Sequence, residues 1–140
     1  MILNRQNRVR VALPPIEKFA QQVQRELRLQ TRDIDICLVS DAEMARLNRT
    51  HQGKRAATDV LSFPAGNSAL RGGGKSLLGD IAIAPMVARR NAKRFGRTLT
   101  DELRILILHG VLHLMGYDHE ADSGQMDRRE RQLRRRFGLE

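Results

Sequence analysis

At 140 residues the chain has the length of one ordinary domain, able to bury a core without disulfides. Its single cysteine, Cys37, excludes an internal disulfide, and it has no apolar run of the roughly 18–20 residues that a membrane span needs. The N-terminus has no signal-peptide pattern, so we expect residues 1–140 to form one soluble, cytoplasmic domain. The formal net charge of +9 favours a polyanionic partner, of which nucleic acid is the commonest in the cytoplasm.

The first half of the chain is predicted to alternate strands with helices. Apolar alternation predicts short strands at residues 2–6 and 9–13, and Pro14 then starts a helix. Residues 34–39 alternate as a further strand, and residues 40–43 have the spacing of a capping box that begins a short helix. The expected core face of the first helix consists of Ile16, Phe19, Val23 and Leu27.

The second half continues this alternation. Strands are predicted at residues 60–64 and 79–83, followed by a basic helix from Pro85 to about Phe95 and by a buried helix that Thr100 is expected to cap. Such an order predicts an α+β domain, with a mixed sheet of four or five strands packed against helices. A final helix is expected to bury Met126, Leu133 and Phe137.

Three of the four histidines, His109, His113 and His119, lie close together in the sequence. The first two are four residues apart, which places them on one face of a helix. Gly116 can adopt a positive φ, end that helix and return the chain, so that His119 approaches the same point. Three imidazoles with one open position are typical of a catalytic zinc site. The helix around them is apolar on all sides, which predicts burial and makes unpaired histidines costly there.

The histidine spacing matches the metzincin pattern of zinc proteases except at one position. Where those proteases have a general-base glutamate, this chain has Gly110. The metal-binding geometry is retained without the peptidase base, which argues against an ordinary zinc protease.

Positive charge is concentrated in two clusters and at an arginine-rich N-terminus. These clusters are either solvated helix faces or nucleic-acid contacts, and their number favours RNA or DNA, bound through the phosphate backbone. The absence of Trp, with one Tyr and four Phe, argues against a broad base-stacking surface. The first cluster is Arg89, Arg90, Lys93, Arg94 and Arg97, and the second is Arg128, Arg129, Arg131, Arg134, Arg135 and Arg136.

A glycine-rich segment at residues 71–76 is similar to the end of a P-loop. That motif requires a glycine where this chain has Ala69, and it requires a helix to follow, whereas residues 79–83 read as a strand. We interpret the segment as a surface loop.

Three separated segments together resemble one family. The run from His109 to Glu120 resembles the signature of the YbeY family of bacterial metal-dependent endoribonucleases, and residues 58–64 and 78–81 are similar to two further blocks of that family. The resemblance implies one zinc ion per chain, held by His109, His113 and His119, and a fold related to zincins. It also implies cleavage of single-stranded RNA, maturation of the 16S ribosomal RNA 3′ end, and ribosome quality control with the small ribosomal subunit as partner.

The chain departs from the family at one position. The family usually has an arginine six residues before the threonine that corresponds to Thr58, and this chain has Gln52 there. A neutral amide cannot replace a guanidinium on a phosphate, so Arg55 or Lys54 is the candidate substitute.

The favoured mechanism is metal-assisted phosphodiester hydrolysis, with a zinc-bound water or a 2′-OH as nucleophile. A carboxylate should orient a histidine or accept a proton, and Asp80 and Asp118 are the candidates. A site role and a turn or cap role are equally open for Asp80, and a turn role is favoured for Asp118. Two other functions remain as alternatives: a zinc hydrolase of another substrate class, and a ribosome-associated RNA-binding protein with a structural metal. A structural zinc would need a fourth protein ligand, for which His51 is the only histidine left.

Overall fold

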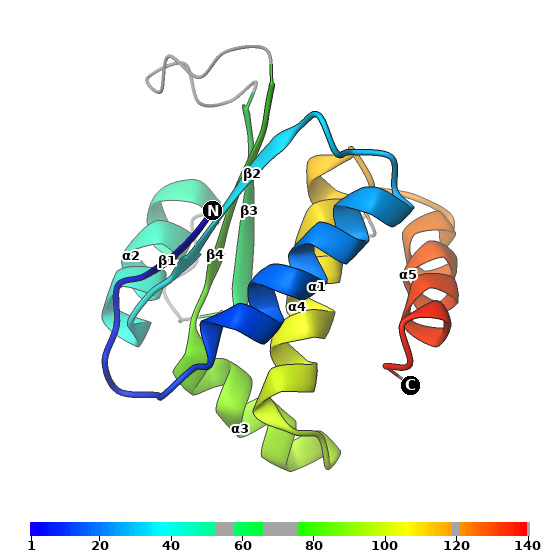
Figure 1. Ribbon diagram of the computed structural model, residues 1–140. Helices are drawn as coiled ribbons and strands as arrows, with labels where there is room; N and C mark the ends of the chain where they lie inside the picture. Colours follow the sequence, from blue (N-terminus) through cyan, green and yellow to red (C-terminus); the bar gives the residue numbers. More distant parts are fainter. Residues whose placement is uncertain (53–57, 66–75, 119–120, 140) are drawn as a thin grey trace.

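The computed structural model describes residues 1–52, 58–65, 76–118 and 121–139, which form a mixed sheet and the helices around it (Figure 1). The four strands lie in the order β1-β2-β4-β3, with β1, β2 and β4 parallel and β3 antiparallel to β4. The expected α+β class with a mixed sheet is therefore confirmed. The elements in chain order are β1 (Ile2–Asn4), α1 (Leu13–Glu26), β2 (Asp33–Leu38), α2 (Asp41–Gln52), β3 (Val60–Pro64), β4 (Leu77–Ile83), α3 (Pro85–Phe95), α4 (Leu99–Leu114) and α5 (Gln125–Arg136).

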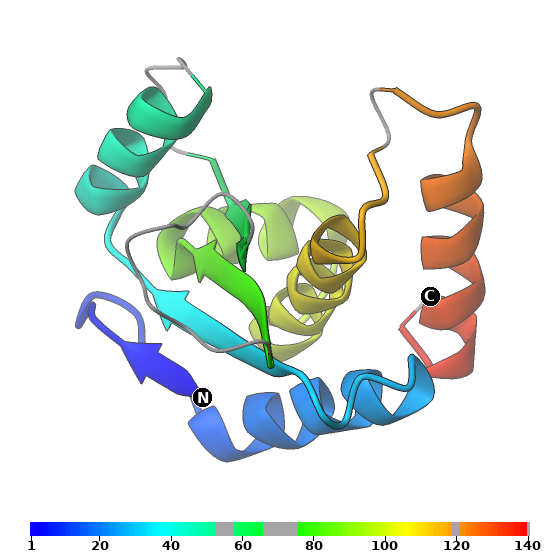
Figure 2. The same ribbon diagram turned by 90° about the horizontal axis from the view of Figure 1, so that it is seen from above.

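Helices cover both faces of this sheet. Figure 2 shows α1 and α4 on one side of the strands and α2 on the other. Because strand residues alternate between faces, the sheet has two separate apolar layers. Ile36, Ile81 and Ile83 pack with α1 and α4 in the larger cluster, whereas Leu61 and Ala82 belong to a smaller cluster on the α2 side.

Helix α5 packs against α4 on the side away from the strands (Figure 2). Met126 and Leu133 are buried in the larger cluster, and the ring of Phe137 meets that of Phe19 edge to face at 5.2 Å between centroids. The predicted apolar stripe of the final helix is confirmed for Met126 and Leu133, and Phe137 is half-buried against the same cluster.

Helix α4 has a well-defined cap at each end. At its start the hydroxyl of Thr98 accepts a hydrogen bond from the Asp101 backbone N–H at 3.1 Å, so the expectation that Thr100 caps the helix is wrong. At its end Gly116 has φ +102°, and the backbone N–H groups of Gly116 and Tyr117 donate to the carbonyls of His113 and Leu112. These two bonds are a Schellman motif. The prediction that Gly116 ends the histidine helix is confirmed.

The expected strand at residues 9–13 is wrong. Val9 is buried, but its backbone pairs with the side chain of Gln6 instead of a neighbouring strand, and α1 already begins at Leu13. Pro14 lacks an N–H and favours the first turn of a helix, which limits the space for a strand before it. The glycine-rich segment is mostly outside the described residues, and the strand β4 that follows it agrees with the expectation that no P-loop helix is present.

No helix within the described ranges is both long enough and apolar enough to cross a membrane.

Candidate metal centre

The two histidines of α4 approach each other through the same ring atom. The Nε2 atoms of His109 and His113 are 3.1 Å apart, and the ring planes are inclined at 73° with centroids 4.7 Å apart. This follows from the helix, because residues four apart lie one turn apart on the same face. Both side chains are half-buried, so the pair lies at the edge of the core, within reach of solvent.

The other ring nitrogen of His109 contacts a carboxylate. Its Nδ1 lies 2.5 Å from Oε1 of Glu130, which comes from α5, 21 residues further along the chain. An ionised carboxylate only accepts hydrogen bonds, so Nδ1 carries a proton, and in a neutral ring Nε2 then carries the lone pair. The second oxygen of Glu130 lies 4.0 Å from the guanidinium of Arg134. Glu130 thus fixes both the orientation and the tautomer of His109.

Glu130 is a residue that the sequence analysis missed. With an exposed side-chain fraction of 15%, it is more sheltered than His109 at 29%. Buried carboxylates are rarely left without a partner, and a carboxylate behind an imidazole is the usual outer support of a metal-binding histidine. A signal existed in the sequence: Met126, Glu130 and Leu133 recur at helical spacing, so a charged residue interrupts the buried stripe of α5.

The donor set fits a zinc ion. Zinc–nitrogen bonds of about 2.0–2.1 Å in a tetrahedron separate two ligand nitrogens by roughly 3.4 Å, close to the 3.1 Å between the two Nε2 atoms. The described parts of the chain contain no group of three or more His, Cys, Asp or Glu side chains that could hold a metal. The third predicted ligand, His119, lies outside those parts, so its place in the site stays a prediction.

Gly110, between the two histidines, faces the sheet. A Cβ built at this position would lie 2.9, 3.0 and 3.2 Å from three side-chain atoms of Ile81. The carbonyl of Gly110 also accepts a hydrogen bond from the Ser62 hydroxyl at 3.1 Å. Glycine therefore lets α4 lie close against β4 and β3. A glutamate at this position would meet Ile81 of the core, which explains physically why the protease base is missing here.

Gly79 forms the second close approach between α4 and the sheet. It has φ +156°, and an added Cβ would lie 2.5 Å from the carbonyl oxygen of Phe63 and 2.6 Å from Cδ2 of Leu114. Leu114 is the residue after His113, so this contact fixes the last turn of α4 against the two strands. The three sequence segments that resemble the YbeY family therefore meet around the C-terminal half of α4.

Asp80 lies on the other face of the sheet from the histidines, and Asp118 lies in the turn that follows α4. Asp80 is next to Gly79 on β4, so its side chain takes the opposite face, the one that Ala82 shares with the α2 cluster. His109 and His113 belong to the helix on the other face. The backbone carbonyl of Asp118 accepts bonds from the N–H groups of Ala121 and Asp122, as expected of a turn residue. Catalytic roles for Asp80 and Asp118 stay predictions without support from their position.

Of the three residues considered for the phosphate contact, Gln52 alone lies within the described residues. Gln52 is the last residue of α2, and Arg55 lies outside the described residues together with Lys54. Their roles stay predictions. His51, the remaining histidine, precedes Gln52 in the last turn of the same helix.

Two half-buried imidazoles on α4 have their Nε2 atoms close together, and a carboxylate contacts Nδ1 of one of them. They define a candidate metal-binding centre of the kind that metal-dependent hydrolases use. Comparison with known proteins supports a nuclease. The family model described as Endoribonuclease YbeY matches residues 1–138. The chain therefore belongs to the YbeY family of endoribonucleases.

Two relatives match over most of their length. The chain is 45% identical to the endoribonuclease YbeY of Solibacter usitatus over 126 residues, covering 90% of this chain and 80% of the relative. It is 37% identical to that of Sulfurovum sp. over 138 residues, covering 98% and 90%. The fold is similar to the solution structure of TM1509 from Thermotoga maritima, with a TM-score of 0.61, 26% identity, and coverage of 94% of this chain and 85% of that one.

Proposed function

We propose that this protein is a zinc-dependent endoribonuclease that cleaves single-stranded RNA. The observation that carries the proposal is the pairing of His109 and His113 through Nε2 while Glu130 occupies Nδ1 of His109. The contact with Glu130 directs the Nε2 lone pair of His109 toward Nε2 of His113, where a cation held by both rings would lie. Membership of the YbeY family supports RNA as substrate, and the net charge of +9 supports a polyanion.

The roles of the residues follow from their contacts. His109, His113 and the predicted ligand His119 would hold the ion, and Glu130 would keep the Nδ1 proton of His109 in place. Ser62 binds the Gly110 carbonyl and so holds the histidine turn against the sheet edge. A bound zinc would supply a hydroxide nucleophile near neutral pH, or polarise a phosphoryl oxygen for attack by a 2′-OH. The half-exposed position of His109 and His113 leaves room for an extended strand of RNA to approach.

The biological role proposed from the family resemblance is maturation of the 16S ribosomal RNA 3′ end and ribosome quality control, with the small ribosomal subunit as partner. A zinc hydrolase of another substrate class is disfavoured by Gly110, whose close contact with Ile81 leaves no place for a peptidase base. An RNA-binding protein with a structural metal is the remaining alternative.

Substrate class distinguishes these functions. The zinc-loaded protein is expected to cut an unstructured oligoribonucleotide, to cut the same sequence much more slowly once it is annealed to its complement, and to leave an unfolded peptide substrate intact. Gel analysis of end-labelled RNA, with mass spectrometry of the peptide, measures all three. Peptide cleavage would favour the general hydrolase, and RNA binding without cleavage would favour the structural metal.

A further inference from the structure

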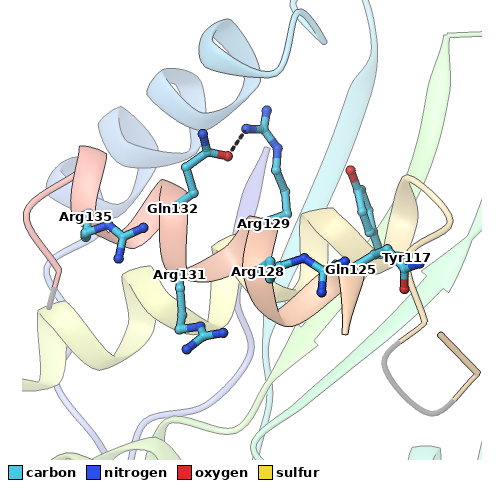
Figure 3. Close-up of a pocket in the computed structure, with 7 residues that line it drawn as sticks. All are labelled: Tyr117, Gln125, Arg128, Arg129, Arg131, Gln132 and Arg135. Atoms are coloured by element: carbon cyan, nitrogen blue, oxygen red, sulfur yellow. Dashed lines mark hydrogen bonds between the residues drawn. The ribbon is translucent and has the colours of Figure 1, made fainter. Parts of the chain in front are cut away.

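The outward face of α5 carries a shallow hollow lined by arginines (Figure 3). Its volume is about 690 Å³, and none of the seven residues that line it is acidic. The side chains of Arg128, Arg129, Arg131 and Arg135 lie along the helix, with Gln132 among them and with Gln125 and Tyr117 at one end. A concave surface of this composition fits an extended polyanion better than an apolar ligand or a protein with a hydrophobic contact face.

Three of the arginines form a row. Arg128, Arg131 and Arg135 are exposed and follow one another at spacings of three and four residues, which places them on one face of the helix along about 10 Å. Arg131 has an ion pair with Asp127 at 3.1 Å, but both side chains are more than half exposed. An exposed pair of this kind contributes little and can exchange for a phosphate. The row therefore offers a line of guanidinium groups instead of a single anion site.

The row is on the same helix as the carboxylate that contacts the candidate metal centre. Glu130, on the inward flank of the same helix turn, binds His109, and Tyr117 follows His113 by four residues. The first basic cluster of the sequence has a different position. It lies on α3, and Figure 1 shows α3 near the N-terminal end of α4, away from the end where the histidine helix passes into α5. Of these two clusters, the α5 cluster is the one nearer to the histidine end of α4.

We propose that the outward face of α5 binds the sugar–phosphate backbone of single-stranded RNA and directs the strand to the histidine pair. The inference rests on the proposed endoribonuclease function and adds where the substrate lies. Guanidinium groups bind phosphate oxygens through paired hydrogen bonds, and Tyr117 offers a ring on which a base can stack at the end nearest the histidines. The basic face of α3 is a solvated helix face.

Two matched triple variants test this assignment. Arg128→Gln, Arg131→Gln and Arg135→Gln together remove three charges from α5, and Arg89→Gln, Lys93→Gln and Arg94→Gln together remove three from the exposed face of α3. Glutamine keeps the helix propensity nearly unchanged, so both variants should fold. The probe is a fluorescently labelled, single-stranded 2′-O-methyl oligoribonucleotide, which binds without being cut by 2′-OH chemistry, and the readout is its dissociation constant at several salt concentrations.

The α5 variant is expected to bind about tenfold or more weakly at low salt, with a log–log salt slope shallower by about 2, because each phosphate contact contributes roughly 0.7. The α3 variant should differ little from the wild type, and both variants should retain the zinc content and melting temperature of the wild type. Equal losses in the two variants, a loss confined to the α3 variant, or no binding by the wild type would overturn the inference. If both variants lose binding equally, or only the α3 variant loses it, while RNA is still cleaved, the proposed function stands and only the docking face is wrong. If only the α5 variant loses binding and the wild type cleaves no RNA, the assignment of the RNA-binding surface stands and the proposed endoribonuclease function is wrong.

Discussion

Replacing His113 by alanine is expected to reduce RNA cleavage to background and to lower zinc affinity by more than 100-fold. Loss of an outer partner of a metal ligand costs about 10–100-fold in affinity, so loss of a ligand itself must cost more. The side chain is half-buried and alanine favours helices, so the metal-free variant should melt close to the metal-free wild type. Zinc content, cleavage of a single-stranded RNA and thermal unfolding measure the three effects.

The matched control is His51→Ala, which removes the one histidine that the predicted ligand set does not include. It should keep its zinc and its activity. Retention of both by His113→Ala, or loss of both in His51→Ala, would contradict the assignment of the ligands.

Glu130→Gln is expected to lower zinc affinity by less than His113→Ala does. Glutamine keeps the size of the side chain, but its amide no longer provides the carboxylate that accepts the Nδ1 proton of His109 at 2.5 Å. Zinc affinity is expected to fall by about 10–100-fold, with activity recovered at higher zinc concentration. Glu26→Gln, which removes the carboxylate paired with Arg136 at the far end of α5, is the control and should leave zinc affinity unchanged. Equal zinc affinity for Glu130→Gln and wild type would mean that Glu130 only packs beside the histidine.

Gly79→Ala is expected to lower the free energy of unfolding by about 3 kcal/mol or more. The new Cβ would lie 2.5 Å from the Phe63 carbonyl oxygen, which is backbone and cannot move aside without disturbing the pairing of β3 with β4. Backbone strain at φ +156° adds to this overpacking. For a chain of this length the melting temperature should fall by about 6–12 °C, measurable by calorimetry or urea unfolding.

Gly96→Ala provides the comparison for the backbone effect alone. Gly96 ends α3 with φ +69°, and an added Cβ would meet nothing within 4 Å. Its substitution should cost only about 1 kcal/mol, the penalty of a left-handed conformation. If the two alanine variants were equally stable, the close approach of α4 to the strands would not be what requires glycine at position 79.

Local patterns were sufficient to predict much of this fold from the sequence. β3 and α3 have the predicted bounds, and Pro85 and Gly116 act where they were expected because proline and glycine restrict the backbone independently of tertiary structure. The strand predicted at residues 9–13 failed because alternation over five residues is a weak signal next to the helix-starting proline that follows. The α4 cap was misplaced by two residues, since Thr98 and Thr100 both precede acidic residues and only the backbone conformation distinguishes them.

The candidate site was predictable in part. The pairing of His109 with His113 follows from helical spacing alone. Glu130 could not be assigned to His109 from the sequence, because the contact depends on how α5 packs across α4. The face of Asp80, in contrast, could have been inferred: Ile81 and Ile83 alternate with Asp80 and Ala82, so the aspartate must lie on the side away from the larger core.

A zinc titration of metal-free wild-type protein tests the central claim most directly, with bound zinc and the rate of cleavage of a single-stranded RNA measured on the same samples. The account predicts that bound zinc and cleavage rise together and that both saturate at one equivalent of zinc per chain. Full cleavage by protein verified to be free of metal, or saturation with zinc without any cleavage of RNA, would contradict it.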